Sequence, residues 1–209
     1  MSILAVLALL LTVPMAQAQS NDKYFEQGLY IEEGWNLIPY GEGLEIEGLQ
    51  EEHLLGAYVY RAGSGDYLDI LENEYQLDQL VDAYGLIPIW IYSDASYSAR
   101  VEVDMREVDE ALRDAEFVFV EGWNYYVLTP QMNPGYDGMH FNIHQNKYGS
   151  VIDDMYMWED GEWEYIYDEF LEWESYNDDG GFILPVLINY DERFTPTMSE
   201  DLSVPAFPY

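Results

Sequence analysis

The tetrapeptide Glu33-Gly34-Trp35-Asn36 occurs twice in this chain of 209 residues, returning as Glu121-Gly122-Trp123-Asn124. An alternating apolar run precedes each copy, Leu29-Tyr30-Ile31-Glu32 in the first and Phe117-Val118-Phe119-Val120 in the second. Alternation with a period of two is typical of a half-buried β-strand, and the glycine that follows marks a turn or a bulge. The repeated stretch therefore predicts the same strand–turn–strand unit at two places in the chain.

Later signals repeat in the same order. The segments 58–70 and 156–163 each predict a β-hairpin, with a tighter turn at Asp160-Gly161-Glu162 in the second. In both halves a glycine lies 18 positions after the last aromatic residue of the hairpin, at Gly85 after Tyr67 and at Gly181 after Trp163. Each glycine opens an apolar strand that contains a proline. The interval from tryptophan to hairpin is 23 residues in the first half and 33 in the second, which predicts a ten-residue insertion within 131–150. Chance similarity of aromatic strands is the alternative, but the shared order favours duplication.

These units predict a mainly β fold of two tandem, related small modules, each with short antiparallel sheets, joined by short helical connections. The first module is expected over residues 19–103 and the second over 116–193. Between them, residues 104–115 form a charged linker in which Val108, Ala111 and Leu112 have helical spacing. Residues 194–209 contain three prolines and are predicted to be an extended or disordered tail.

The motif residues have predictable physical roles. Gly34 and Gly122 are expected to adopt a backbone conformation that other residues avoid. Asn36 and Asn124 are expected to hydrogen-bond the backbone of the turn. Trp35 and Trp123 are each expected to anchor the core of one module. All of these are folding roles, so the motif itself predicts structure more than binding.

The charge balance is extreme, with 41 acidic and 7 basic residues and a net charge of −34. Nucleic acid is excluded as a partner because phosphate contacts need lysine and arginine, and anionic membrane surfaces are disfavoured for the same reason. A hydrophobic content of 49% with 16% aromatic residues argues against disorder. Two interpretations of the acidity stay open, solubility in a saline setting and binding of Ca²⁺ by carboxylates.

The chain has no cysteine, which excludes disulfides, thiolate metal sites and a cysteine nucleophile. Residues 1–18 predict a signal peptide, because an apolar run over 3–13 is followed by Ala16-Gln17-Ala18. Eleven apolar residues are too few to span a bilayer as a helix. No basic residue precedes the run, so an unprocessed N-terminal helix is the alternative. The predicted location is extracellular, at a cell surface or in a virion.

The order of Gly-Trp-Asn with an apolar strand, an aromatic hairpin, and glycine with another apolar strand resembles the GWN β-modules (GWNLIGYP-like) of secreted, surface and virion-associated proteins. The resemblance implies small repeated β units with an adhesive or structural role and supplies no catalytic residue. Two departures stand out: Ile38-Pro39-Tyr40 replaces the usual Ile-Gly-Tyr, and the second copy continues as Asn124-Tyr125-Tyr126-Val127.

Candidate metal ligands are few. His140 and His144 are four residues apart with Asp137 nearby, a spacing that suits zinc on a helix, but the surrounding sequence is typical of a loop. Asp178 and Asp179, and the pair Asp153-Asp154, lack the alternating ligands of a Ca²⁺ loop. Turn formation and solvated charge explain these residues as well, so Ca²⁺ is the one cofactor considered.

Catalytic patterns are weaker still. Acidic pairs are guaranteed by 41 carboxylates, and no nucleophile-elbow or phosphate-loop motif is present in the sequence. The expected function is therefore a secreted, non-catalytic structural or adhesive protein of a surface or virion. The alternative is a carbohydrate- or Ca²⁺-binding module of an extracellular glycan-processing system. Expected partners are a protein or glycan at a surface, or a second copy of the chain.

Overall fold

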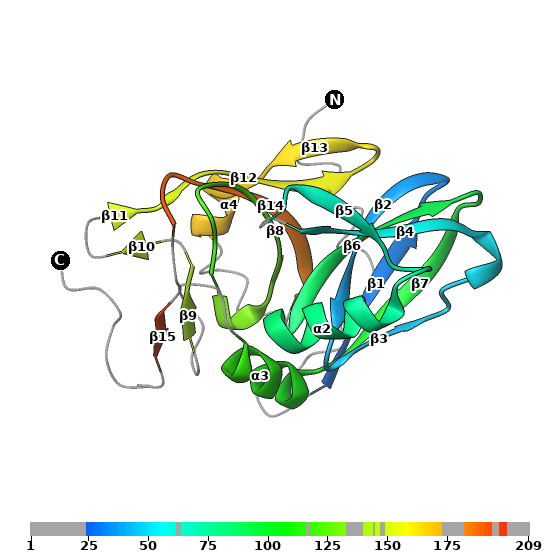
Figure 1. The fold of residues 1–209 in the computed structure, drawn as a ribbon, viewed down its shortest axis with the longest axis horizontal. Helices are drawn as coiled ribbons and strands as arrows, with labels where there is room; N and C mark the ends of the chain where they lie inside the picture. Colours follow the sequence, from blue (N-terminus) through cyan, green and yellow to red (C-terminus); the bar gives the residue numbers. More distant parts are fainter. Residues whose placement is uncertain are drawn as a thin grey trace.

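The computed structural model describes residues 24–61, 64–115, 118–132, 140–143, 145–146, 149–172, 182–193 and 197–199. Over these residues the protein is mainly β, as the sequence predicts (Figure 1). Two four-stranded antiparallel sheets form its centre, one from each half of the chain. The predicted signal peptide lies outside the described residues.

The two central sheets are built from equivalent strands in the same order. The first sheet has the order β2 (Gly34–Gly41), β6 (Leu86–Ser93), β4 (Leu54–Arg61) and β5 (Asp66–Asp69). The second has the order β8 (Gly122–Leu128), β14 (Leu184–Tyr190), β12 (Ile152–Glu159) and β13 (Glu162–Tyr165). The predicted pair of related modules is therefore correct, and each motif glycine opens the first strand of its sheet.

The register of the two sheets also agrees. Trp35 pairs with the residue one before the end of β6, and Trp123 pairs with the residue one before the end of β14. A bulge interrupts β4 after Leu54 and β12 after Ile152, at equivalent positions. The offset between the halves is 88 residues at Gly34 and 98 at Leu54, so the second half carries the predicted ten extra residues between these points.

Proline within β6 and β14 is tolerated for one shared reason. Pro88 pairs with Pro39 of β2, and Pro185 pairs with Val127 of β8. The pairing of β4 with β6 stops at Trp90, and that of β12 with β14 stops at Val186, so each proline is paired with a strand on one side only. Proline has no N–H to donate to a second ladder, so it fits a position that is paired on one side only.

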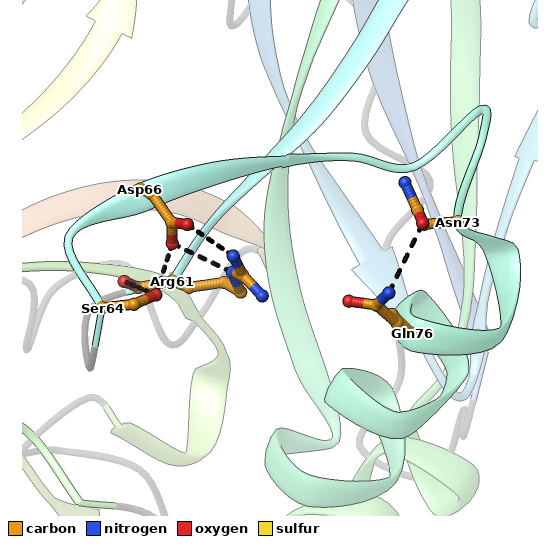
Figure 2. A network of polar contacts seen from close by, with 5 residues as sticks. All are labelled: Arg61, Ser64, Asp66, Asn73 and Gln76. Atoms are coloured by element: carbon orange, nitrogen blue, oxygen red, sulfur yellow. Dashed lines mark hydrogen bonds and ion pairs between the residues drawn. The ribbon is translucent and has the colours of Figure 1, made fainter.

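The hairpins show two ways of closing the same unit. In the second module Asp160 and Gly161 both have positive φ, 50° and 78°, as a two-residue hairpin turn requires. In the first module the longer loop is closed by Arg61, whose guanidinium donates to the Asp66 carboxylate at 3.0 and 2.5 Å (Figure 2). Ser64 also donates to Asp66, and beyond the hairpin Gln76 donates to Asn73 at the start of the next helix.

One sheet has no counterpart among the described residues of the other half. It consists of β1 (Tyr24–Ile31), β7 (Tyr97–Asp104) and β3 (Leu44–Glu47), in the order β1-β7-β3. The offset of 88 places the equivalent of β1 at residues 112–119, and the described part of this range begins with the last residues of a helix that ends at Asp114. Within the described residues, the duplication therefore extends to the four-stranded sheets and not to the sheet β1-β7-β3.

Three helices are described, α2 (Glu74–Tyr84), α3 (Met105–Asp114) and α4 (Tyr167–Glu172), and none is long and apolar enough to cross a membrane. The predicted connecting helix is α3, which buries Val108, Ala111 and Leu112. The Asp104 carboxylate caps it by accepting from two backbone N–H groups. Gly85 (φ 70°) caps the C-terminus of α2, and a Cβ there would come within 3.1 Å of the α3 backbone, so glycine permits the close approach of these helices.

Short elements complete the described structure. They are η2 (Glu51–His53), η3 (Pro130–Met132), β9 (His140–Asn142), β10 (Gln145–Asn146), β11 (Gly149–Ser150) and β15 (Thr197–Ser199). Strand β15 lies in the predicted tail and pairs with β9 in the region of the insertion, on the opposite side of Figure 1 from β1 and β7. The insertion and the tail therefore form a small sheet that the described residues of the first module do not have.

Two clusters of buried residues hold the molecule together. The first cluster lies under the first sheet and includes Ile38, Ile89 and Ile91. The larger cluster lies under the second sheet, yet it also contains Val103 of β7 and Leu112 of α3. The end of the first module thus completes the core of the second. Residues 104–115, which the sequence predicts as a linker, therefore also contribute to that core.

Candidate functional site

Each motif asparagine clamps the turn before it. The Asn36 carboxamide oxygen accepts from the Glu32 N–H at 2.8 Å, and its Nδ2 donates to the carbonyls of Glu32 and Gly34 at 2.9 and 3.1 Å. Asn124 repeats all three bonds with Val120 and Gly122, at 3.0, 2.8 and 2.8 Å. Both side chains are buried, so the predicted backbone role of the asparagines is confirmed.

The motif glycines serve the same turn. Gly34 has φ 114° and Gly122 has φ 92°, conformations that L-residues rarely adopt. A Cβ at either position would meet no atom within 4 Å, so the requirement for glycine comes from the backbone angle and not from crowding. The prediction for the two glycines is therefore confirmed.

The prediction that Trp35 and Trp123 anchor the two cores is wrong. The two indoles are 45% and 43% exposed. Residues alternate between the two faces of a strand, and the neighbouring Asn36 and Asn124 occupy the core-facing side of their sheets. The tryptophans therefore lie on the opposite, aromatic face.

The aromatic faces of the two sheets meet, and we call their contact the aromatic seam. Its members are Trp35, Tyr58, Tyr60, Tyr67, Trp90 and Tyr92 from the first sheet and Tyr125, Trp158 and Trp163 from the second. Trp90 lies at its centre, with ring centroids 5.1 Å from Trp158, 5.8 Å from Trp163 and 6.2 Å from Tyr125. These contacts are edge-to-face, the geometry that aromatic quadrupoles favour.

Polar contacts also join the two modules. The Trp158 indole N–H donates to the carbonyl oxygen of Trp35 at 2.9 Å. The Gln27 side chain of β1 donates to the Ile183 carbonyl at 2.9 Å and accepts from the Ile183 N–H at 2.8 Å. The interface is thus held by directional bonds as well as by aromatic contact.

The two motif tryptophans form equivalent half-exposed platforms. Trp35 lies 5.8 Å from Tyr58 at an interplanar angle of 57°, and Trp123 lies 5.8 Å from Tyr156 at 55°. Tyr92 adds a third ring at 5.0 Å from Trp35, whereas its equivalent in the second sheet is Asn189. Fixed, half-exposed aromatic rings can stack on apolar faces of a ligand, but they offer no proton transfer or nucleophile.

Most of the candidate metal ligands lie outside the described residues: Asp137, His144, Asp178 and Asp179. His140 is the first residue of β9, so a helix does not present it. Within the part of the chain that the structure describes, no group of three or more His, Asp or Glu side chains is placed to hold a metal ion. The described residues thus supply no Ca²⁺ or zinc site to build on.

His53 pairs with an aspartate, as the histidine of a catalytic triad does, but the serine near the pair has a structural role. Its Nδ1 lies 2.7 Å from the Asp94 carboxylate at the surface. The hydroxyl of the nearby Ser96 accepts from the Glu33 backbone N–H, which gives that serine a structural role. The pair ties η2 to the turn after β6, where the Asp94 N–H also donates to the His53 carbonyl.

One carboxyl group in the hairpin β12–β13 is electrostatically unusual. Burial, a hydrogen bond with the Glu164 carboxyl and repulsion by nearby carboxylates together raise the pKa of Glu159 to about 7. One of those carboxylates, Glu32, belongs to the turn before the first motif. The hairpin of the second module therefore places an acid beside the Gly34 turn of the first.

We expect Glu159→Gln to stabilise the protein at pH 8 and to leave it nearly unchanged at pH 5. A folded-state pKa raised above the unfolded value gives stability that is complete below about pH 4.5 and is lost as pH rises through about 7. Solvent screening of this partly exposed group limits the gain to about 1 kcal/mol. Urea unfolding at both pH values measures it. Glu162→Gln, the exposed cross-strand neighbour, is the control, and an equal gain at both pH values would contradict the assignment.

Comparison with family models, with curated proteins and with solved structures finds no match to this chain.

Proposed function

We propose that this protein is a secreted, non-catalytic structural or adhesive component of a cell surface or virion. The observation that carries the proposal is the pair of equivalent tryptophan platforms, which the fold holds half-exposed at Trp35 and Trp123. A protein that only needed a core would gain by burying these indoles, since burial of a large aromatic side chain is worth about 2 kcal/mol or more.

The polar groups of the described residues support a non-catalytic role. The buried amides Asn36 and Asn124 are satisfied by backbone groups, and His53 is paired at the surface. These three side chains therefore have structural roles. We infer that the protein acts by binding through its exposed side chains. The sequence resemblance to GWN modules and the predicted leader support export.

The charge of the chain limits the kinds of surface to which the protein can adhere. A net charge of −34 repels anionic membranes and acidic polymers over the Debye length of about 8 Å at physiological salt. A surface with neutral or cationic groups is therefore the complement of this protein. We expect its adhesion to be driven by aromatic contact and to depend on both platforms.

Localisation and variants test the proposal together. An antibody should label intact cells or particles of the source without permeabilisation; labelling only after permeabilisation would refute export. The double variant Trp35→Ala/Trp123→Ala should be shed from the surface, whereas Tyr75→Ala should stay attached. Tyr75 is the matched control because it is 73% exposed on α2. Equal retention of all forms would exclude the platforms as the adhesive site.

A carbohydrate-binding role is the second candidate, favoured by the repeated geometry of Trp35–Tyr58 and Trp123–Tyr156. Aromatic rings at such positions suit the apolar faces of sugar rings. The acidic surroundings favour neutral sugars or amino sugars over uronic or sulfated ones. An array with all three classes tests this, and saturable binding that the double tryptophan variant loses would support it. Calorimetry with Ca²⁺ tests the metal alternative separately.

A further inference from the structure

Two tyrosine hydroxyls meet across the seam, and neither adhesion nor sugar binding uses their contact. The Oη of Tyr67 on β5 lies 3.3 Å from the Oη of Tyr125 on β8, although the residues are 58 positions apart. Tyr67 is 52% exposed, whereas Tyr125 is half-buried among the seam aromatics. A phenol that solvent reaches is thus in contact with a phenol of the other module.

We propose that Tyr67 and Tyr125 are a site of oxidative crosslinking that joins the two modules as dityrosine. A haem peroxidase with hydrogen peroxide is the class of oxidant required. One electron and one proton leave each phenol, and the two phenoxyl radicals form a single carbon–carbon bond between ring positions next to the oxygens. Each ring regains its aromaticity by passing the displaced hydrogen to its own oxygen. The protein loses two hydrogens, and the peroxide is reduced to two waters.

The geometry selects this pair over its neighbours. Coupling occurs beside the hydroxyl, so the two rings must meet at their hydroxyl ends, as Tyr67 and Tyr125 do. Tyr60 packs against both, with ring centroids 5.2 Å from each, and supports them from the side. Tyr156 and Tyr165 are also close, at 5.5 Å, but they belong to one hairpin and their coupling would not join the modules.

A crosslink here has a physical use. The chain has no cysteine and a net charge of −34, so it lacks disulfides and its parts repel one another. A bond between residues 58 positions apart restricts the unfolded chain much as a disulfide does. The inference rests on the proposed function in one respect, because export would expose Tyr67 to peroxide. The chemistry of the purified protein does not depend on it.

The test uses the purified full chain, dilute enough to disfavour intermolecular coupling, with a haem peroxidase and hydrogen peroxide. We expect dityrosine fluorescence, a monomer on a denaturing gel, a mass lower by two hydrogens and a crosslinked peptide pair containing Tyr67 and Tyr125. The unfolding midpoint in urea should rise after oxidation. Tyr67→Phe should lose the fluorescence and the stabilisation, while Tyr75→Phe, which alters a more exposed tyrosine, should keep both.

Different results would overturn the crosslink and the proposed function. Tyr67→Phe keeps the ring and its packing, and circular dichroism before oxidation verifies that it folds. If the mapped link joins other tyrosines, if only intermolecular dimers form, or if Tyr67→Phe yields as much intramolecular dityrosine as the unaltered chain, the proposal is overturned. Failure of surface labelling would instead refute the proposed function and leave the crosslink assignment standing.

Discussion

Replacing Trp90 with alanine is expected to destabilise the protein by about 3–5 kcal/mol, the range for large aromatic residues in a well-packed interior. Trp90 is 9% exposed and comes from β6, an inner strand of the first sheet. Its ring contacts Trp35 of its own sheet and three aromatic rings of the second sheet. Its loss opens a cavity where the two modules meet, and urea unfolding at neutral pH measures the cost.

The matched control is Trp123→Ala. The Trp123 indole is 43% exposed and is in ring contact with Tyr156 of its own sheet, so about 1 kcal/mol is expected. Both variants remove the same side chain, and the comparison isolates the contribution of the seam. Equal costs for the two variants would mean that the seam does not hold the modules together.

The repeat itself was predictable because its signals are local. The glycine turn, the hairpins and the proline-containing strands each depend on residues a few positions apart. Because these signals come in the same order in both halves, the two sheets share one strand order, β2-β6-β4-β5 and β8-β14-β12-β13. The asparagine clamps were predictable for the same reason, since each bonds a residue four positions earlier.

The side of the sheet on which the tryptophans lie was not predictable from alternation. The middle of β2 is buried on both faces, with Leu37 at 6% and Ile38 at 1% exposure, so hydrophobicity does not distinguish the core side from the seam side. The deciding fact is that a second aromatic face covers Trp90. That contact joins residues of different modules, so it cannot be predicted from the periodicity of a single strand.

Long-range contacts also explain what sequence reasoning missed at Glu159 and α3. The pKa of Glu159 is raised partly by Glu32, which lies in the other module. The spacing of Val108 and Leu112 predicted a helix but not its destination in the core of the second module. The one signal that pointed to the seam was the aromatic content of both hairpins, at Tyr60 and Tyr67 and at Trp158 and Trp163.

Removing either motif asparagine should cost nearly the same, about 2–3 kcal/mol for Asn36→Ala and for Asn124→Ala. Each substitution leaves one N–H and two carbonyl groups of a turn without the carboxamide, and each unsatisfied buried group costs about 1 kcal/mol or more. The two asparagines are 7% and 3% exposed, so water replaces the lost bonds poorly. Urea unfolding measures both, with the exposed Gln79→Ala expected to stay within about 0.5 kcal/mol.

The double variant Asn36→Ala/Asn124→Ala extends this test to the duplication. The two clamps lie in different sheets and share no hydrogen-bond partner, so their costs should add within about 0.5 kcal/mol. Equal and additive costs are what two copies of one folding device produce. A cost at one asparagine alone would mean that only one turn still depends on its clamp, and the motif would then have kept its sequence in the other module for a reason other than stability.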